Sequence, residues 1–219
     1  MSEMNFEQAR FNMIEQQVRP WEVLDPRVLD VLDNIKRDFF VPERYKRLAY
    51  ADIAVPIDHQ QSMMHPVVEG RMLQALSISP DDRILEIGTG SGFITACLAF
   101  LGGNVLSVDI YADFIETCGE KLKSLGVHNV KLQTGDASKG WGEQNYDAIA
   151  ITGGLSSVES VWLEKLAVGG RLFAVTGEDT LMNAVLITRT SKNEWTTDSL
   201  FETKLAYLIN TTKKNKFNF

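Results

Sequence analysis

The chain has 219 residues, of which 44% are hydrophobic and 23% are charged, a composition that suits one domain with a sizeable buried core. The formal net charge of -7 and a pI near 5.0 argue against nucleic acid as the main partner. No apolar run is long enough to span a bilayer, and the N-terminus lacks the basic and apolar stretches of a signal peptide. These features predict a soluble cytoplasmic protein that does not bind membranes.

The first part of the chain is predicted to be helical. Apolar residues at helical spacing indicate one helix over residues 6–18 and a second that starts at Asp25-Pro26, an N-cap followed by proline in the first turn. Between residues 39 and 66 the periodicity is lost although apolar and aromatic residues remain, which indicates an ordered irregular segment with a functional role. A third helix starts at Pro66. We assign residues 1–78 to this N-terminal helical and substrate-loop region.

The centre of the chain carries a short strand followed by a glycine-rich turn. Residues 84–87 form the apolar run expected of a strand that is buried on both faces. Glycines then occupy every second position, at Gly88, Gly90 and Gly92, and a helix begins near Phe93. Glycine permits positive φ and lets a ligand approach the main chain, and the free N–H groups of the helix start point into the turn. This stretch is a candidate ligand site.

A carboxylate follows at the end of the next strand. Residues 104–108 are predicted to form a strand that ends in Asp109, which can accept hydrogen bonds from two ribose hydroxyls. A dinucleotide-binding turn would carry its third glycine at Phe93, so the spacing disfavours an NAD-dependent oxidoreductase. The alternative is a glycine-rich turn beside a solvated aspartate. We favour the ligand site because both features occur in register.

Strands and helices alternate through the rest of the chain. A helix with an apolar stripe around Phe114 and Cys118 is predicted to end at Gly126. The remaining strands are predicted over residues 130–134, 148–152, 171–175, 184–189 and 201–209, the last two joined as a hairpin across residues 191–193, with Trp195 packing near the turn.

This order predicts an α/β fold with a doubly wound, mostly parallel, seven-stranded Rossmann-like sheet, an N-terminal helical extension and an antiparallel C-terminal hairpin. The sheet domain covers residues 79–210, and residues 211–219 form a flexible tail.

The cysteines and histidines show no metal-binding pattern. Cys97 and Cys118 fall within predicted amphipathic helices, so we expect buried free thiols. His59, His65 and His128 lack the spacing of metal ligands. We therefore predict no metal site.

The residues from Glu86 to Gly92 have the spacing Glu-x-Gly-x-Gly-x-Gly, which resembles the first motif of S-adenosylmethionine-dependent methyltransferases. Further motifs resemble the protein-L-isoaspartate O-methyltransferase family, in the same order, from residue 39 to about residue 177. They are Phe40-Val41-Pro42, Leu48-Ala49-Tyr50-Ala51-Asp52, Pro56-Ile57, Gln61 with Pro66, Leu125-Gly126 with Asn129-Val130, Gly135-Asp136, Gly140-Trp141, Tyr146-Asp147-Ala148-Ile149 and Gly169-Gly170-Arg171-Leu172. The resemblance implies a methyltransferase sheet, S-adenosyl-L-methionine as the cofactor, and the repair of isoaspartyl-containing proteins or peptides.

The resemblance also implies which residues bind the cofactor. The glycine loop packs against the methionine part, the segment at Asp109 holds the ribose, and Gly135-Asp136 contacts the adenine, although Asp136 alone would also suit an ordinary turn. The expected set is Glu86, Gly88, Thr89, Gly90, Ser91, Gly92, Asp109, Ile110, Gly135, Asp136 and Ala137.

The acceptor side departs from the family pattern. The family has Thr-Ile-Ser between its glutamine and its proline, with the serine assigned as catalytic; here Ser62 keeps a hydroxyl at the threonine position, but Met64 occupies the serine position. Ser62 or His65 is then the candidate catalytic donor that holds the acceptor carboxylate. The sequences Gly135-Asp136-Ala137 and Gly153-Gly154-Leu155-Ser156 also differ from the family's Gly-Asp-Gly and from its alanine-rich loop that ends in proline.

These departures leave three hypotheses. The chain is a divergent isoaspartate methyltransferase that acts on an isoaspartyl or other carboxylate, or it methylates a small molecule such as a small carboxylate, with Met63 and Met64 lining an apolar acceptor pocket. Alternatively, it binds the cofactor or a damaged peptide without turnover. Nucleic-acid bases are disfavoured as acceptors, because the chain lacks the Asn/Asp-Pro-Pro-aromatic loop of base-amino methyltransferases and a cysteine nucleophile on a ligand loop. A monomer is the favoured oligomeric state.

Overall fold

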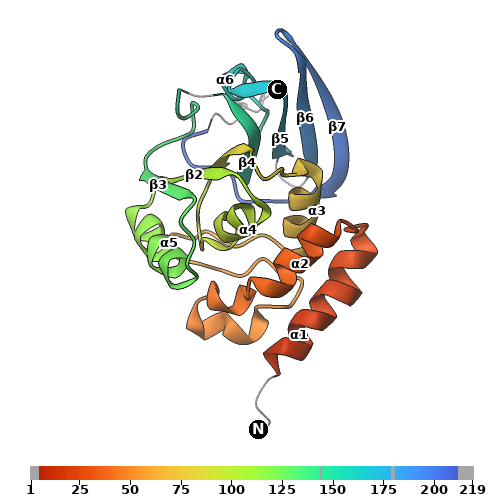
Figure 1. Cartoon of the computed structure of the whole chain (residues 1–219), viewed down its shortest axis with the longest axis vertical. Coiled ribbons are helices and arrows are strands. Elements are labelled where there is room, and N and C mark those ends of the chain that lie inside the picture. Colours follow the sequence, from red (N-terminus) through yellow and green to blue (C-terminus); the bar gives the residue numbers. More distant parts are fainter. Residues whose placement is uncertain (1–4, 144, 179–180, 212–219) are drawn as a thin grey trace, which may run out of the picture.

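A seven-stranded sheet forms the centre of the molecule (Figure 1), whose computed structural model describes residues 5–143, 145–178 and 181–211. Its strands are β1 (Arg83–Ile87), β2 (Asn104–Asp109), β3 (Val130–Thr134), β4 (Tyr146–Leu155), β5 (Leu166–Glu178), β6 (Leu181–Ser191) and β7 (Glu194–Thr203). They lie in the order β3-β2-β1-β4-β5-β6-β7, and the first five pair in parallel whereas β6 is antiparallel to both of its neighbours. The chain changes direction across the sheet between β1 and β4, where parallel sheets bind ligands at the carboxyl ends of their strands.

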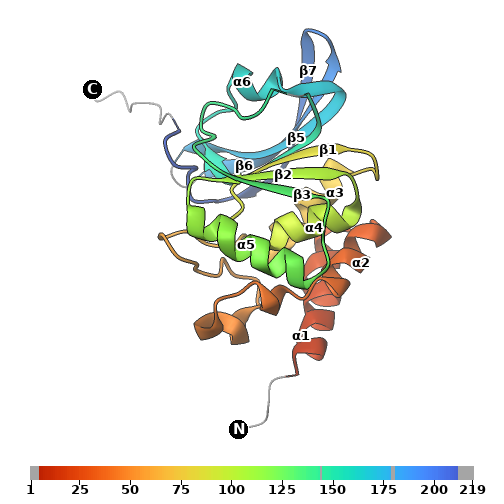
Figure 2. The ribbon, with the colours of Figure 1, turned by 60° about the vertical axis from the view of Figure 1, so that its left-hand side comes forward.

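Helices cover the two faces of the sheet unequally (Figure 2). They are α1 (Phe6–Met13), α2 (Pro26–Asn34), α3 (Pro66–Leu76), α4 (Phe93–Leu101), α5 (Ala112–Ser124) and α6 (Ser160–Leu163). The first five lie on one face, and the short α6 lies on the other. Successive residues of a strand point to opposite faces, so Ile84 joins the core under the helices while Leu85 joins the core that contains Trp162 of α6. The predicted fold class is confirmed.

The N-terminal helices pack into the same core as the sheet. α1 continues as a π-helical turn over Ile14–Val18, and α2 starts as predicted, with the Asp25 carboxylate accepting a hydrogen bond from the Arg27 N–H at 2.9 Å. Met13 and Leu32 from this region share one hydrophobic cluster with Ile84 and Phe173 from the sheet. The N-terminal region is therefore part of the wall that supports the sheet.

Two predictions for the end of the sheet are wrong. Gly153-Gly154, expected in a loop, lies within β4, and the last strand covers Glu194–Thr203 instead of residues 201–209. Residues 205–209 instead form a strap across the end of β4, where Gly154 N–H donates to the Ala206 carbonyl at 2.7 Å and Leu208 N–H donates to the Gly154 carbonyl at 2.8 Å. The lack of a side chain at Gly153 permits this close approach, since a Cβ at this position would lie only 3.2 Å from the Cα of Leu208.

Several smaller predictions are confirmed. The hairpin turn lies between β6 and β7, and Trp195 packs beside it with its indole N–H donating to the Leu163 carbonyl at 3.2 Å. Cys97 and Cys118 are buried free thiols. The predicted tail lies outside the described residues except for Thr211.

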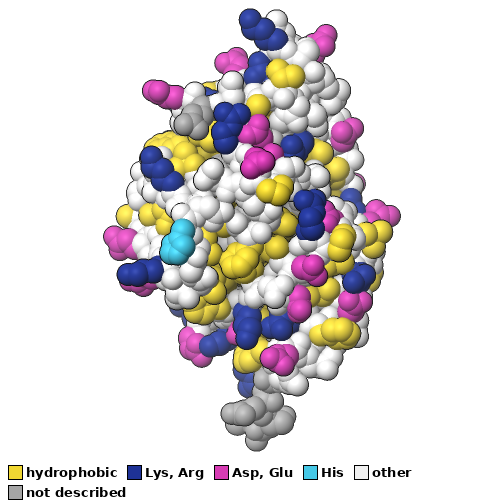
Figure 3. All heavy atoms as spheres, in the orientation of Figure 1, with side chains coloured by type: hydrophobic (Ala, Val, Ile, Leu, Met, Phe, Trp, Pro, Cys, Tyr) yellow, Lys and Arg dark blue, Asp and Glu magenta, His cyan; other side chains and the backbone are white. Residues whose placement is uncertain are grey.

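Surface charges of both signs are interspersed on the face shown in Figure 3. Among the described residues, no helix is long and apolar enough to cross a membrane, and no cluster of three or more His, Cys, Asp or Glu could hold a metal ion.

Candidate active site

The glycine turn between β1 and α4 has a backbone that only glycine adopts easily. Gly88, Gly90 and Gly92 have φ values of 94°, 51° and 84°, all in the left-handed region. A Cβ on Gly88 would lie 2.3 Å from the Thr152 hydroxyl oxygen, and one on Gly92 would lie 2.7 Å from the Cys118 sulfur. The turn is therefore a cradle of bare main chain at the carboxyl end of β1.

Asp109 stands beside this turn at the carboxyl end of β2. Its Oδ2 accepts a hydrogen bond from the Gly90 N–H at 2.9 Å, and its Oδ1 accepts one from the Tyr111 N–H at 3.0 Å. The side chain is largely buried, and burial raises the pKa of the carboxyl group although the backbone N–H groups oppose this shift. Each oxygen keeps a lone pair for a ligand, so Asp109 can accept hydrogen bonds from two neighbouring hydroxyls.

A buried polar network fixes the turn from below. Glu86 Oε2 accepts hydrogen bonds from the hydroxyls of Ser107 at 2.5 Å and Thr95 at 2.6 Å, and the Thr89 hydroxyl lies 2.6 Å from that of Ser107. Glu86 is fully buried, and desolvation raises its pKa to about 8. It supports the turn from within the core and is not part of the pocket wall, unlike the ligand-contacting role expected from the sequence.

The segment after β3 forms the far end of the site. Gly135 N–H donates to the Asp109 carbonyl at 2.8 Å, and a Cβ on Gly135 would lie 2.1 Å from the Trp141 ring. Asp136 Oδ1 accepts from the Ser138 N–H and Oδ2 accepts from the Asn210 side-chain amide, both at 2.9 Å. These hydrogen bonds, that from Ser138 first, hold the pKa of the Asp136 carboxyl below its usual value.

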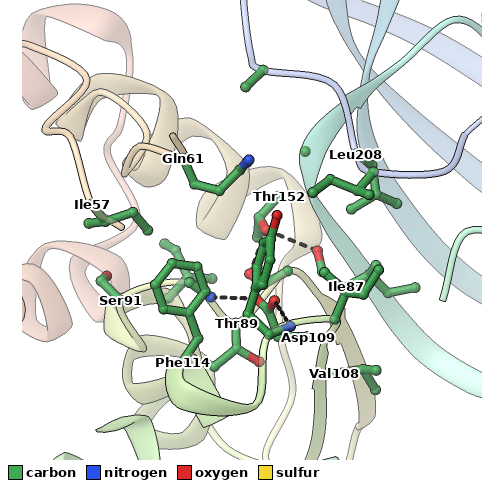
Figure 4. Close-up of a pocket in the computed structure, with 18 of the residues that line it drawn as sticks. Ile57, Gln61, Ile87, Thr89, Ser91, Val108, Asp109, Phe114, Thr152 and Leu208 are labelled. Carbon is green, nitrogen blue, oxygen red and sulfur yellow. Dashed lines mark hydrogen bonds between the residues drawn. The ribbon is translucent and has the colours of Figure 1, made fainter. Parts of the chain in front are cut away.

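A pocket joins these groups at the carboxyl ends of β1, β2 and β4 (Figure 4). Its wall contains every expected cofactor residue except Glu86, which is buried beneath the turn, and Gly92, which ends the turn at the start of α4. Ile57 and Gln61 reach it from the irregular segment, and Leu208 reaches it from the strap over residues 205–209. The pocket is therefore closed by two segments that lie far apart in the sequence.

The candidate acceptor residues lie at the irregular segment. Ser62, Met63 and Met64 line the pocket, and both methionine side chains are buried. His65 is not part of the pocket wall; its Nδ1 lies 3.0 Å from the Asp52 carbonyl oxygen. The structure thus brings Ser62 into the site and leaves His65 at the start of α3, outside it.

The sequence profile of the protein-L-isoaspartate(D-aspartate) O-methyltransferase family matches residues 8–214. The chain belongs to this family. A relative named protein-L-isoaspartate O-methyltransferase from Syntrophus aciditrophicus is 35% identical over 86% of this chain and 87% of its own. A second from Pelobacter propionicus, named protein-L-isoaspartate O-methyltransferase 2, is also 35% identical, over 94% and 92% of the two chains.

A solved structure agrees with the fold. A Plasmodium falciparum protein, assigned as a protein-L-isoaspartate O-methyltransferase and in complex with S-adenosyl-L-homocysteine, superposes with a TM-score of 0.80 at 22% identity, over 97% of this chain and 100% of its own. S-adenosylmethionine is the cofactor of this isoaspartate methyltransferase family, and the pocket fits it: the turn leaves bare main chain for the ligand, and Asp109 offers two acceptor oxygens.

The sequence did not predict a buried ion pair that lies beside the candidate acceptor residues. Arg37 Nε donates to Glu69 Oε2 at 2.9 Å and Nη2 donates to Oε1 at 3.1 Å, with both side chains almost fully buried. The same guanidinium donates to the carbonyls of Ala49 at 2.6 Å and Met64 at 2.7 Å. Glu69 lines the pocket, so this pair fixes the main chain at the position where the family carries its serine.

Proposed function

We propose that the chain methylates the free carboxylate of isoaspartyl residues in damaged proteins and peptides. The observation that carries the proposal is the match of the isoaspartate methyltransferase family to residues 8–214, together with a pocket that offers Asp109 and a glycine cradle to the cofactor. The relatives are named for this activity.

The reaction needs alignment more than acid-base catalysis. Bound S-adenosylmethionine supplies an electrophilic methyl group on a sulfonium, and an ionised carboxylate is already a competent nucleophile. The protein therefore has to hold the acceptor oxygen in line with the bond that breaks and to exclude water. The buried methionines, Met63 and Met64, and the strap at residues 205–209 suit the second task.

Ser62 is the proposed donor to the acceptor carboxylate. Its hydroxyl belongs to a pocket-lining residue, whereas His65 lies outside the wall and is the weaker candidate. A donor to the oxygen that does not attack would fix the orientation of the carboxylate and leave the lone pairs of the attacking oxygen free.

Methyl transfer to paired peptides tests the proposal. Labelled S-adenosylmethionine would be offered with two peptides identical except for isoaspartate or aspartate at one position. We expect selective, base-labile labelling of the isoaspartyl peptide and a rate at least about tenfold lower for Ser62→Ala, since one charge-assisted hydrogen bond is lost. Equal labelling of both peptides would refute the substrate assignment, and an unchanged rate in the variant would remove Ser62 from the mechanism.

A small-molecule acceptor remains the second candidate, because both Met63 and Met64 line the pocket and make its acceptor side apolar. The Met64→Ser variant separates the two candidates, since it replaces an apolar wall by a hydroxyl. Faster transfer to the isoaspartyl peptide would support the repair function. If neither protein labels either peptide while both bind S-adenosylhomocysteine, the acceptor is a different molecule or the protein is a non-catalytic binder.

The proposal also covers the location, the oligomeric state and the partners of the enzyme. We place it in the cytoplasm, with a monomeric enzyme that acts on proteins or peptides and has neither nucleic acid nor membrane as a partner. Gel filtration with light scattering checks the oligomeric state directly.

A further inference from the structure

The turn at residues 58–61, here called the gate turn, has an unfavourable backbone. Gln61 N–H donates to the Asp58 carbonyl at 3.0 Å, and Ile57 N–H donates to the Gln61 carbonyl at 2.9 Å, which closes a tight hairpin turn. Its two central residues, His59 and Gln60, have φ values of 54° and 59°. Residues other than glycine adopt this left-handed conformation at a cost, so it persists only where other contacts hold it.

His59 supplies contacts of this kind. Its ring is stacked on Tyr111, with centroids 3.8 Å apart and the planes within 3°, and it meets Phe114 edge-on at 5.2 Å. Its Nε2 lies 2.8 Å from Asp113 Oδ2. The hydrogen bond to His59 holds the pKa of Asp113 below its usual value, so the carboxylate keeps its charge at neutral pH. One side chain thus connects the gate turn to the start of α5.

These contacts join two segments that both line the pocket. Ile57 and Gln61, on either arm of the gate turn, line the pocket, as do Tyr111 and Phe114 at the start of α5. Figure 4 shows Ile57, Gln61 and Phe114 around this space. A Cβ on Gly90 would lie 3.4 Å from Ile57 Cδ1, so Ile57 covers the glycine cradle itself. A ligand in the cradle therefore lies beneath the gate turn.

The other closing segment is held more firmly. The strap at residues 205–209 shares two backbone hydrogen bonds with Gly154 of β4, the Tyr207 hydroxyl donates to the Gly177 carbonyl at 2.9 Å, and Asn210 donates to Asp136. The gate turn, in contrast, is held to α5 through partly exposed side chains, with His59 and Asp113 exposed to 35% and 57%. Opening at the gate turn therefore breaks weaker contacts.

We propose that the gate turn opens to admit and release the cofactor, and that His59 is the positioning residue that closes it by binding Asp113 and Tyr111. The inference rests on the assignment of the pocket to the cofactor, but not on the identity of the methyl acceptor. No part of the wall formed by the strap has to move.

The dissociation rate of S-adenosylhomocysteine reports directly on the opening of the gate turn. The enzyme would be loaded with tritiated S-adenosylhomocysteine and diluted into an excess of unlabelled compound. We expect His59→Gly to dissociate about 3- to 30-fold faster, because the ring stack and the hydrogen bond to Asp113 are lost. Asp113→Asn, which keeps the stack, should give a smaller increase.

The glycine variant separates the role of the ring from that of the turn. Glycine adopts φ near 54° without strain, so a turn that closed through its backbone alone would keep or lower the dissociation rate in His59→Gly, and this result would overturn the proposal. Arg44→Gln is the matched control, since the ion pair of Arg44 is with Asp58 of the same turn, at 3.5 Å, and not with α5; it should leave the rate unchanged.

Amide hydrogen exchange in the ligand-free protein gives a second readout. His59→Gly should speed exchange in the gate turn and leave the strap at residues 205–209 protected. Faster exchange in the strap than in the gate turn of the wild type would show that the cofactor leaves on the other side. Both measurements stand even if the isoaspartyl peptide is not methylated, so the two proposals fail independently.

Discussion

Two buried carboxyl groups at the ends of neighbouring strands have different chemistry because their partners differ. Asp109 accepts hydrogen bonds from the backbone N–H groups of Gly90 and Tyr111, which favour its ionised form. Glu86 accepts only two hydroxyl hydrogen bonds on Oε2, and its Oε1 is buried without a partner among the described residues. Asp109 therefore suits a ligand contact, whereas Glu86 is a mostly protonated support for the glycine turn at neutral pH.

The state of Glu86 predicts how stability depends on pH. In the unfolded chain Glu86 ionises above its ordinary pKa of 4.5, whereas in the folded protein burial raises its pKa to about 8. Folding takes up a proton in this window, so the free energy of unfolding should fall as the pH rises through it, by roughly 3 to 5 kcal/mol for this group. Glu86→Gln stays neutral and should show a flatter profile.

Urea unfolding of both proteins at about pH 5 and about pH 8 checks this expectation. Other carboxyl groups with raised pKa, such as Glu69, contribute with the same sign to both proteins, so only the difference between the two slopes is attributable to Glu86. Identical slopes would show that Glu86 is ionised in the folded protein.

At the scale of elements, the sequence predicts the features that depend on local patterns and misses those that depend on distant partners. The start of α3 at Pro66 was predicted, but the role of Glu69 within it was not. Both neighbours of Glu69, Val68 and Gly70, are buried too, so its burial disturbs no periodicity, and its partner Arg37 lies 32 residues earlier in the chain. The strap at residues 205–209 was mistaken for a strand for a related reason: apolar residues follow one another in both.

The Arg37–Glu69 pair connects α3, the irregular segment and the acceptor position, and its loss should be costly. Arg37→Met leaves a buried carboxylate alone in the pocket wall, so we expect a loss of about 3 to 5 kcal/mol in the free energy of unfolding. The double variant Arg37→Met/Glu69→Met removes both charges and should recover part of that stability. Urea unfolding measures both effects, and a double variant less stable than Arg37→Met would contradict the explanation.

At the scale of the whole molecule, the order of strands and helices was predictable because apolar runs and amphipathic stripes alternate along the chain. The division into an N-terminal region over 1–78 and a sheet domain over 79–210 stays a prediction. The sequence did not indicate that Met13 and Leu32 share a hydrophobic cluster with Phe173, because a stripe indicates that a face is buried but not which residues cover it.

The shared cluster predicts that the chain unfolds in one cooperative step. Removal of α1 and α2 would expose the core residues under α3 and α4, so neither region should remain folded without the other. Calorimetry should show a single transition whose calorimetric and van't Hoff enthalpies agree, moved to higher temperature by S-adenosylhomocysteine. Two transitions, with only one sensitive to the ligand, would establish that the N-terminal region is an independent folding unit.

The strap is the last part of the pocket wall to be synthesised on the ribosome. Residues 205–209 come after β7, whereas the glycine cradle, Asp109 and the gate turn all precede it. Chains are synthesised from the N-terminus, so the glycine cradle, Asp109 and the gate turn exist before the strap has been translated. A nascent chain therefore has the proposed cofactor-binding groups but lacks the part of the pocket wall that the strap forms, and the pocket becomes complete only when the segment after the last strand has emerged and docked on β4.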